Sequence, residues 1–373
     1  MQTTTTAGVS GDWPMIEAQL PVRFREMAVE HKVIRKNASQ LGAKITDAAV
    51  LLRLILHHVA AGASLKVTCA AAAVAAVASI SAVALHLRMR TSGSWLAAMV
   101  AEMMATAWTF AAERWAGYEI VVTDATVLTR PGGDGTTARI HYALRLGNLS
   151  LVQCLVTDQH VGETLRWFNV EAGQLWMGDR CYANPPAVAF VKERGGEVLV
   201  RYNFGALPLY SKRGQRCDVR ALVATLGNPG RVREWPVYVR PESGKLIAGR
   251  LCAVRLPPAK AKEARARLRK EQGSSLTAES LSTAEFVVIF TTVPRGKLST
   301  ERVMELYALR WQVELHIKRD KTIRAFDELP NFRDDTIHSW ICAKLLAQQI
   351  AARIATPQVA FPPSAVGEIA LAS

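Results

Sequence analysis

Four polar side chains that could act on a phosphate occur together in one short stretch of the chain. The stretch reads YALRWQVELHIKRDK, from Tyr307 to Lys321. In a helix of about 100° per residue, four of its side chains would lie within an arc of roughly 60°; they are Tyr307, Arg310, Glu314 and Lys321. A solvated helix edge with ion pairs such as Glu314 with Lys318 would give the same pattern. One acid, two bases and a phenol on one edge therefore indicate either such a solvated edge or a site for an anionic substrate.

Two further acids each end a short apolar run. Asp124 ends YEIVVTD, and Asp179 ends QLWMGD. Acids at strand ends are often simply exposed, yet α/β sheets also place their functional groups there. If Asp124, Asp179 and Glu314 meet, they form an all-oxygen site that suits Mg²⁺, for which Mn²⁺ can substitute. Two such ions about 4 Å apart can activate a water or a 3′-hydroxyl and stabilise the leaving oxygen of a phosphodiester.

The order of the predicted elements indicates how these acids could meet. Residues 1 to about 115 have the spacing of helices, and the pattern changes after Trp115. We predict strands over 118–124, 138–143, 150–157, 174–179 and 197–202, with helices over 163–168 and 185–194. A three-strand meander followed by helix, strand, helix and strand is the order of a ribonuclease-H-like α/β domain. In that layout the first and fourth strands are neighbours and a later helix packs over their ends, which would bring Asp124, Asp179 and Glu314 together.

A basic segment interrupts this alternation between residues 206 and 283. It contains 16 Lys and Arg against 6 Asp and Glu, with strand-like pieces at 234–240 and 246–255. We predict a mainly β insertion, followed by a strand at 285–291 and a helix capped around Ser299. The expected organisation is a helical N-terminal domain for DNA binding, a catalytic domain in two segments, the insertion between those segments, and a loose tail. Their bounds are 1–115, 116–205 with 284–350, 206–283 and 355–373.

Composition narrows the class of protein. The 373 residues carry 46 Lys and Arg against 32 Asp and Glu, a formal charge of +14 that favours nucleic acid or another polyanion as partner. The six cysteines form no CxxC pair, and none stands beside a His at zinc-finger spacing. We therefore expect free thiols in a reducing cytoplasm and no zinc site. The N-terminal MQTTTTAGVSGDWP lacks a basic start followed by an apolar core, which argues against a secretory signal.

An alanine-rich stretch over 67–85 imitates a membrane span, because it holds no charge over 19 residues. Alanine drives membrane insertion weakly, so we favour two short helices broken near Ser79. Ser79 or Ser81 would cap the second helix, and Arg88 and Arg90 would close it. The pair is either a DNA-binding helix-turn-helix or part of a plain helical bundle.

The stretch from Tyr307 to Lys321 has the spacing YxxRxxxExxxxxxK, which matches the YREK signature, and the chain resembles the insertion-sequence-four family of DDE transposases. The segments VVTDATVL and WMGDRCYA resemble the regions that hold the two aspartates of that family. The basic insertion also lies where the family has one. The resemblance covers about residues 110–350. It implies that Asp124, Asp179 and Glu314 are the metal-binding catalytic triad.

The resemblance also implies contacts with DNA. Tyr307, Arg310 and Lys321 would contact the DNA end near the cut, and Arg180 would either contact DNA or form an ion pair at the strand end. In some family members a hairpin intermediate forms and a flipped base stacks on an aromatic residue. Trp235, in the insertion, is a candidate for that role, beside an ordinary role in the core or at the surface. The implied activity is cut-and-paste transposition by a homodimer bound to terminal inverted repeats and target DNA, in the bacterial cytoplasm or nucleoid.

Three alternatives stay open at this point. A metal-dependent nuclease without strand transfer would carry the same residues, and only a joining assay separates it from a transposase. A catalytically decayed copy or an inhibitor of transposition would bind DNA without cutting it, and the short chain after the last predicted helices could impair subunit pairing. A membrane protein would rest on the alanine-rich stretch alone.

Overall fold

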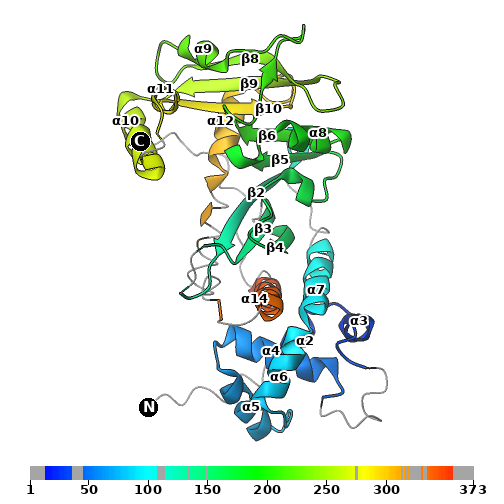
Figure 1. Cartoon of the computed structure of the whole chain (residues 1–373). Helices are drawn as coiled ribbons and strands as arrows, with labels where there is room; N and C mark the ends of the chain where they lie inside the picture. Colours follow the sequence, from blue (N-terminus) through cyan, green and yellow to red (C-terminus); the bar gives the residue numbers. More distant parts are fainter. Residues whose placement is uncertain are drawn as a thin grey trace. The chain divides into compact units, whose positions relative to one another are not determined.

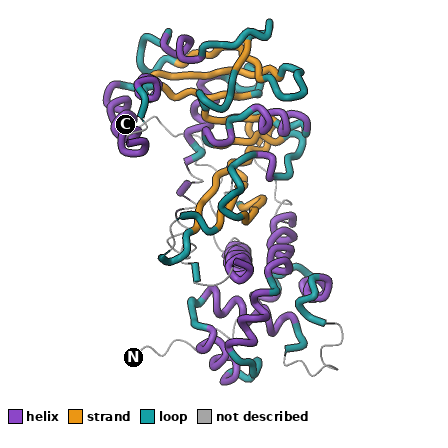
Figure 2. Tube along the Cα trace, viewed as in Figure 1, coloured by secondary structure: helices purple, strands orange, loops and turns teal. Residues whose placement is uncertain are grey.

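The computed structural model describes residues 13–35, 45–106, 114–132, 135–147, 150–273, 276–311, 314–315, 318, 329–330 and 334–355. The chain forms two compact units. The first comprises Met1–Ala107, Arg130–Gly133 and Thr322–Ser373, and its described helices have the blue, cyan and orange-red colours in Figure 1. The second comprises Trp108–Thr129 and Asp134–Lys321, and it contains the strands that are orange in Figure 2.

The first unit is built from helices. They are α2 (Trp13–Glu17), α3 (Phe24–Glu30), α4 (Ala48–Ala60), α5 (Leu65–Val74), α6 (Ala82–Arg90), α7 (Gly93–Thr106) and α14 (Asp334–Ala355). α14 packs against α7 and α4 and buries Trp340 and Ile341. Near its end, Arg353 donates to the backbone carbonyls of Gln19 and Met103. The predicted helical character of the N-terminal region is confirmed. We expected residues up to 350 in the catalytic domain, and α14 packs with the helices of this unit.

The alanine-rich stretch forms two separate helices, as favoured. α5 ends at Val74, Ala76 adopts a left-handed φ of 52°, and α6 begins at Ala82. The Ser81 hydroxyl caps α6 by accepting from the backbone N–H of Ala84 at 3.2 Å. Arg88 is tied inward, because it donates to the backbone carbonyl of Val33 at 3.0 Å. In the described part of the chain, no helix is long and apolar enough to cross a membrane.

The described residues of the second unit form one ten-stranded sheet. Its order is β4-β3-β2-β5-β6-β10-β9-β8-β7, with β1 (Arg114–Trp115) paired to β2 off this path. The first five strands on that path are β4 (Leu151–Thr157), β3 (Ala138–Arg145), β2 (Tyr118–Leu128), β5 (Gln174–Gly178) and β6 (Glu197–Arg201). β2, β3 and β4 form an antiparallel meander, while β5 is parallel to both β2 and β6. The predicted meander and the pairing of the first with the fourth strand are therefore confirmed.

Two short elements connect and cover these strands. α8 (Pro185–Glu193) lies where a helix was predicted, and Asn184 caps it by accepting from the backbone N–H of Ala187. The helix predicted over 163–168 is wrong in type, because only the 3₁₀ turn η2 (Leu165–Trp167) forms there. Thr164 caps that turn and Phe168 already has extended backbone, so there is room for a single turn only.

The basic insertion continues the same sheet and adds helices. β7 (Leu209–Tyr210), β8 (Val232–Val239) and β9 (Ile247–Arg255) join it through β10 (Phe286–Thr291), which is antiparallel to β6 and β9. Its described residues also form the helices α9 (Val219–Ala224), α10 (Pro258–Gln272) and α11 (Ala278–Thr283). The expectation of a mainly β insertion is thus wrong for its second half. The run AKAKEARARLRK alternates Ala with Lys, Arg and Glu, all strong helix formers, after a proline at the first helical turn.

The core beneath the sheet fixes the turn that follows β5. Trp176 of β5 and Tyr182 are fully buried in one hydrophobic cluster with Val198 and Phe290. A Cβ added at Gly178 would lie 2.9 Å from the Tyr182 ring, so the chain can fold back over β5 at this point only with a glycine. This packing sets the position of the residue between them, Asp179.

Candidate active site

Parallel pairing of β2, β5 and β6 brings three charged residues to one level of the sheet. The last paired levels are Val122 with Met177 and Gly178 with Val200. Continuing both registers puts Asp124 beside Asp179 and Asp179 beside Arg201, at strand spacings of about 4.8 Å. The sequence predicted that Asp124 ends its strand, and this prediction is wrong. β2 runs on to Leu128, and beyond the end of β5 it pairs with β3 alone.

Backbone hydrogen bonds orient both aspartates. Asp124 Oδ1 accepts from the backbone N–H of Ala125 at 2.9 Å. Asp179 Oδ1 accepts from the backbone N–H of Cys181 at 2.8 Å and caps the 3₁₀ turn η3 (Arg180–Tyr182). Each carboxylate keeps its second oxygen for another partner.

The predicted helix carrying the third acid is present but not continuous. α12 (Thr300–Ala308) begins at its predicted cap, Ser299, whose hydroxyl accepts from the backbone N–H of Arg302. At its end the backbone N–H groups of Leu309 and Arg310 bond to carbonyls three residues earlier, which tightens the backbone to a 3₁₀ turn. Helical backbone resumes at Trp311 and includes Glu314. The expectation of one regular helix through the whole stretch is therefore wrong.

Arg310 joins the two sides of the site. Its Nη2 lies 2.5 Å from Glu314 Oε1, and its Nη1 lies 4.0 Å from Asp124 Oδ2. The guanidinium carbon lies 5.6 Å from the centre of the Tyr307 ring. Burial opposes the charge of Arg310, but Tyr307, Glu314 and Asp124 outweigh it and raise the pKa of Arg310 above its ordinary value.

Burial of Asp124 changes the acidity of its carboxyl group. Burial raises the pKa of Asp124 to about 6, and the negative charges of Asp179 and Glu314 add to this effect. The N–H of Ala125 and the charge of Arg310 work in the opposite direction. Three carboxylates therefore converge in a partly buried space with more negative charge than Arg310 balances. An all-oxygen donor set of this kind fits a hard divalent cation such as Mg²⁺, which Asp124, Asp179 and Glu314 would hold.

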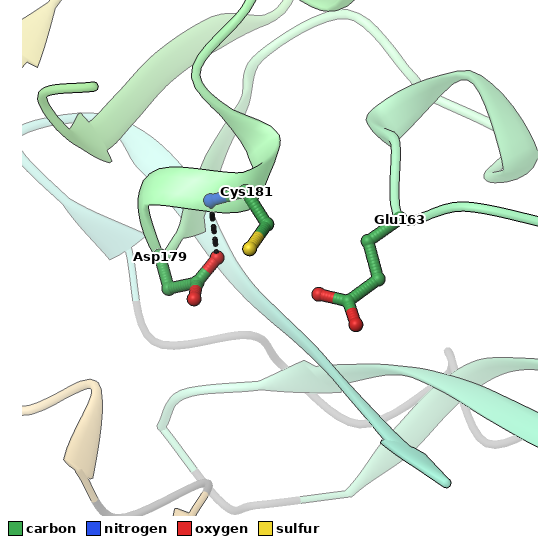
Figure 3. Close-up of side chains that lie close together, drawn as sticks. All are labelled: Glu163, Asp179 and Cys181. Carbon is green, nitrogen blue, oxygen red and sulfur yellow. Dashed lines mark hydrogen bonds between the residues drawn. The ribbon is translucent and has the colours of Figure 1, made fainter. Parts of the chain in front are cut away.

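A fourth acid that sequence reasoning missed lies next to Asp179. Glu163, in the segment between β4 and η2, offers a carboxylate oxygen within 4.8 Å of one from Asp179 and of the Cys181 sulfur. Figure 3 shows the Glu163 carboxylate pointing toward Asp179 and Cys181, and the hydrogen bond that holds Asp179 in place. Nothing in the local sequence marks Glu163, since it stands in a loop outside any apolar run.

A cavity of about 490 Å³ opens beside Asp179, Tyr307 and Arg310. Its walls come from the end of β6, the following loop, α9, α10, α11 and β10. Its lining includes four further arginines, namely Arg180, Arg201, Arg220 and Arg267. Arg220 pairs with Glu279 at 3.0 Å and lies 5.5 Å from the Phe204 ring, which also lines the cavity. The other three are exposed and have no acidic partner among the described residues, so this cavity attracts anions.

The predicted site residues separate into three groups. Asp124, Asp179, Glu314, Tyr307 and Arg310 lie together, and Arg180 lines the adjoining cavity. Trp235, on β8, does not line that cavity; it packs against the hydrophobic core with the Arg233 guanidinium 5.3 Å from its ring. Lys321 lies outside the described residues.

Arg201 is a second charged residue that sequence reasoning missed, although a signal for it existed. It directly ends the apolar strand EVLV, one parallel strand away from Asp179. Because the carboxyl ends of parallel strands lie along one edge of a sheet, the same rule that selected the aspartates also points to Arg201.

Comparison with known proteins gives similarity over most of the chain. The profile of a family described as "Transposase DDE domain" matches residues 115–349. The transposase for insertion sequence element IS421 of Escherichia coli is 30% identical over 343 residues, which cover 89% of this chain and 92% of that protein. The InsL protein of insertion sequence element IS186A of Escherichia coli (strain K12) is 30% identical over 342 residues, with the same coverage.

Proposed function

Because the chain belongs to the transposase DDE domain family, and is thus an enzyme that cleaves and transfers DNA strands, we propose that it moves an insertion sequence by cutting and rejoining the ends of that element. The YxxRxxxExxxxxxK spacing supports membership of the insertion-sequence-four group with the YREK signature. The observation that carries the proposal is the convergence of Asp124, Asp179 and Glu314 around Arg310.

The three acids have the role of holding divalent cations. When bound, Mg²⁺ or Mn²⁺ supplies activation of the attacking water or 3′-hydroxyl and stabilisation of the leaving oxygen. Arg310 bonds to Glu314 and lies at the limit of an ion pair from Asp124, so it stands between the two carboxylates. Its Nε and the Tyr307 hydroxyl are buried and have no hydrogen-bond partner among the described residues. Tyr307 and Arg310 both line the adjoining cavity, and from that wall they would contact the phosphate at the cut.

The arginine-lined cavity would take the DNA strand next to that phosphate. Arg180, Arg201 and Arg267 present guanidinium groups without acidic partners in the described chain, and such groups bind phosphates. Phe204, with Arg220 beside it, offers the aromatic surface that unpaired bases stack on. A cavity of about 490 Å³ suits a strand separated from its complement better than a duplex. This role suits Phe204 better than Trp235, because Phe204 lines the cavity and Trp235 does not, although both pack partly against the core.

Partners follow from the reaction. Transposition requires both element ends to be held together, and we propose a homodimer on the terminal inverted repeats that then engages target DNA. Sedimentation of the protein with and without DNA of the element ends gives the stoichiometry. A 2:2 complex is expected, and a complex that stays at one chain per end under cleavage conditions would contradict the dimer.

The decisive test uses labelled DNA that carries one element end with its flanking sequence. With Mg²⁺, the wild-type chain should nick at the element boundary and join the new 3′-end to target DNA. Glu314→Gln should bind the same DNA but lose cleavage by at least a hundredfold, while Glu305→Gln, an exposed acid of α12, should cleave normally. Cleavage without joining would indicate a nuclease. Binding without cleavage by both wild type and Glu314→Gln would indicate a non-catalytic DNA-binding protein.

A further inference from the structure

Asp179 has a fourth acid, Glu163, close to it in addition to the proposed triad of Asp124, Asp179 and Glu314. Glu163, Asp179 and Cys181 offer ligand atoms that all lie within 4.8 Å of one another. Glu163 reaches this point from the segment before η2, while Asp179 and Cys181 come from the turn after β5 (Figure 3). We propose that Glu163 is a fourth carboxylate of the divalent-metal site and that it binds the cation together with Asp179. This inference rests on the proposed function, because it assigns a further residue to the same site.

An ion pair with Arg139 accounts poorly for the position of Glu163. Arg139 Nε is 4.0 Å from Glu163 Oε1, the limit of an ion pair, and Arg139 Nη1 already donates to the Val161 carbonyl at 2.6 Å. The side chains of Glu163 and Asp179 are both partly enclosed, so their mutual repulsion is incompletely screened. A cation between the two carboxylates would turn this repulsion into attraction.

A buried hydroxyl gives an independent reason to place a ligand here. Tyr182 has 0% of its surface exposed, and its hydroxyl makes no hydrogen bond within the described part of the chain. The equally buried Thr123 hydroxyl interacts with it, and neither hydroxyl has a further partner in the described part of the chain. The Tyr182 oxygen is also within electrostatic range of Glu163, Asp124 and Asp179. The Tyr182 hydroxyl therefore lies near the acidic space from the side of the buried core.

The donor chemistry separates Glu163 from Cys181. Two carboxylates provide the hard oxygen ligands that Mg²⁺ and Mn²⁺ prefer, whereas a thiol prefers softer ions. Cys181 is thus a neighbour of the cation in the working enzyme, and its closeness makes it a reporter. A thiophilic ion such as Cd²⁺ that enters the space between Glu163 and Asp179 comes within reach of the Cys181 sulfur.

The first experiment measures Mn²⁺ binding to the full chain without DNA, by electron paramagnetic resonance. Glu163→Gln should weaken the affinity for Mn²⁺ about tenfold, the lower end of the range for loss of a group that supports a metal site. Glu193→Gln, an exposed acid at the end of α8, removes the same charge and should bind Mn²⁺ as the wild type does. Unchanged Mn²⁺ affinity in a folded Glu163→Gln protein overturns the inference.

Two further measurements separate metal binding from a structural role. Arg139→Gln removes the ion pair but keeps Glu163, so Mn²⁺ affinity should be retained; a loss as large as that of Glu163→Gln would show that Glu163 acts only through Arg139. In the wild-type protein, Cd²⁺ should produce a thiolate charge-transfer band in the ultraviolet that Cys181→Ser removes. Absence of this band at saturating Cd²⁺ would contradict a cation at this position.

Failure of the inference and failure of the proposed function give different results. If Glu163→Gln binds Mn²⁺ normally and Glu314→Gln abolishes DNA cleavage, Glu163 is not a ligand and the transposase assignment stands. If Glu163→Gln weakens Mn²⁺ binding and the wild-type chain never cleaves DNA, the metal site stands and the proposed function falls. Where both hold, Glu163→Gln should also shift the Mg²⁺ concentration for half-maximal cleavage upward by about tenfold.

Discussion

At the residue scale, the close acids of the site lower the folding stability of the protein when no metal ion is bound. The pKa of Asp124 is raised to about 6, first by burial and then by the charges of Asp179 and Glu314. An aspartate in an unfolded chain has a pKa of about 3.9. The folded state therefore binds a proton more tightly than the unfolded state does. Folding stability consequently falls as the pH rises from 4 to 6, and the full penalty is present above pH 6.

Replacement of Asp124 by Asn should remove this penalty. In EDTA at pH 8, Asp124→Asn is expected to raise the free energy of unfolding by about 3 kcal/mol, since two pKa units correspond to roughly that amount. At pH 5 the gain should be about half as large. Urea denaturation at the two pH values measures both, with Glu193→Gln as a control for the loss of one negative charge. A gain that is equally large at both pH values would mean that packing, and not charge, causes it.

The sequence rules that identify the three acids also show where such rules end. Asp124 and Asp179 follow apolar runs, and neighbouring strands then bring them to one level. Arg201 obeys the same rule and could have been predicted with them. Glu163 could not, because its position beside Asp179 depends on the path of a loop and on the single turn η2. No local pattern of residue types specifies that path.

At the element scale, one network ties the helix that carries Tyr307 to the sheet. Glu234 Oε2, on β8, accepts from Arg250 Nη1 of β9 at 2.6 Å and from the Thr300 hydroxyl of α12 at 2.6 Å. Arg250 also donates to the carbonyls of Val293 and Leu298, in the segment between β10 and α12. The start of α12 is thereby fixed against the extended half of the sheet. The insertion strands therefore help to position the helix that carries Tyr307.

Glu234→Gln should loosen this attachment. Burial opposes the charge of Glu234, but the hydrogen bonds from Thr300 and Arg250 outweigh it and lower the pKa of Glu234. The stabilisation is therefore present above pH 4.5 and is lost as the pH falls through the lowered folded-state value. At pH 7, urea denaturation should show a loss of about 2 kcal/mol, typical of a hydrogen-bonded charge. Glu305→Gln, in an exposed pair with Arg302, should change stability by less than about 0.5 kcal/mol. Equal effects of the two substitutions would contradict the anchoring role.

Element types were predictable where residue patterns were strong and failed where geometry decided. The apolar runs of β2, β5 and β6 specify strands. The 3₁₀ tightening at Leu309 and Arg310 follows no propensity, because the residues around it are ordinary helix formers. It coincides with the contacts of Arg310 to Glu314 and Asp124, so tertiary contacts at the site are a sufficient reason for the local departure.

At the scale of the whole molecule, the positive charge is concentrated where a strand of DNA would enter the site. The chain carries a formal charge of +14, and residues 206–283 alone carry 16 Lys and Arg against 6 Asp and Glu. Two of the arginines in the cavity, Arg220 and Arg267, come from this segment, and Arg180 and Arg201 come from the strand ends next to it. The charge excess was visible in the sequence, but its concentration around one cavity depends on the fold of α9 to α11 against β6 and β10.

The salt dependence of DNA binding tests whether this charge meets phosphates. Each phosphate neutralised on a single strand contributes about 0.7 to the slope of log affinity against log salt concentration, and on a duplex about 0.9. The double substitution Arg201→Gln with Arg267→Gln should therefore reduce the magnitude of the slope by about 1.4 on an element end with an unpaired 3′-strand. Arg231→Gln, an exposed arginine outside the cavity, is the matched control for each charge removed.

Comparing two forms of DNA shows whether Arg201 and Arg267 bind a strand inside the cavity or only add to the positive charge of the whole surface. If the cavity holds a separated strand, the double variant should show a shallower slope of log affinity against log salt concentration on the end with an unpaired strand. On an uncut duplex of the same sequence, its slope should stay close to that of the wild type. Fluorescence anisotropy over a range of potassium chloride concentrations measures both. An equal loss on the two forms would mean that Arg201 and Arg267 contribute only to the overall field of the protein, and a wild-type slope on both would remove them from the DNA-binding surface.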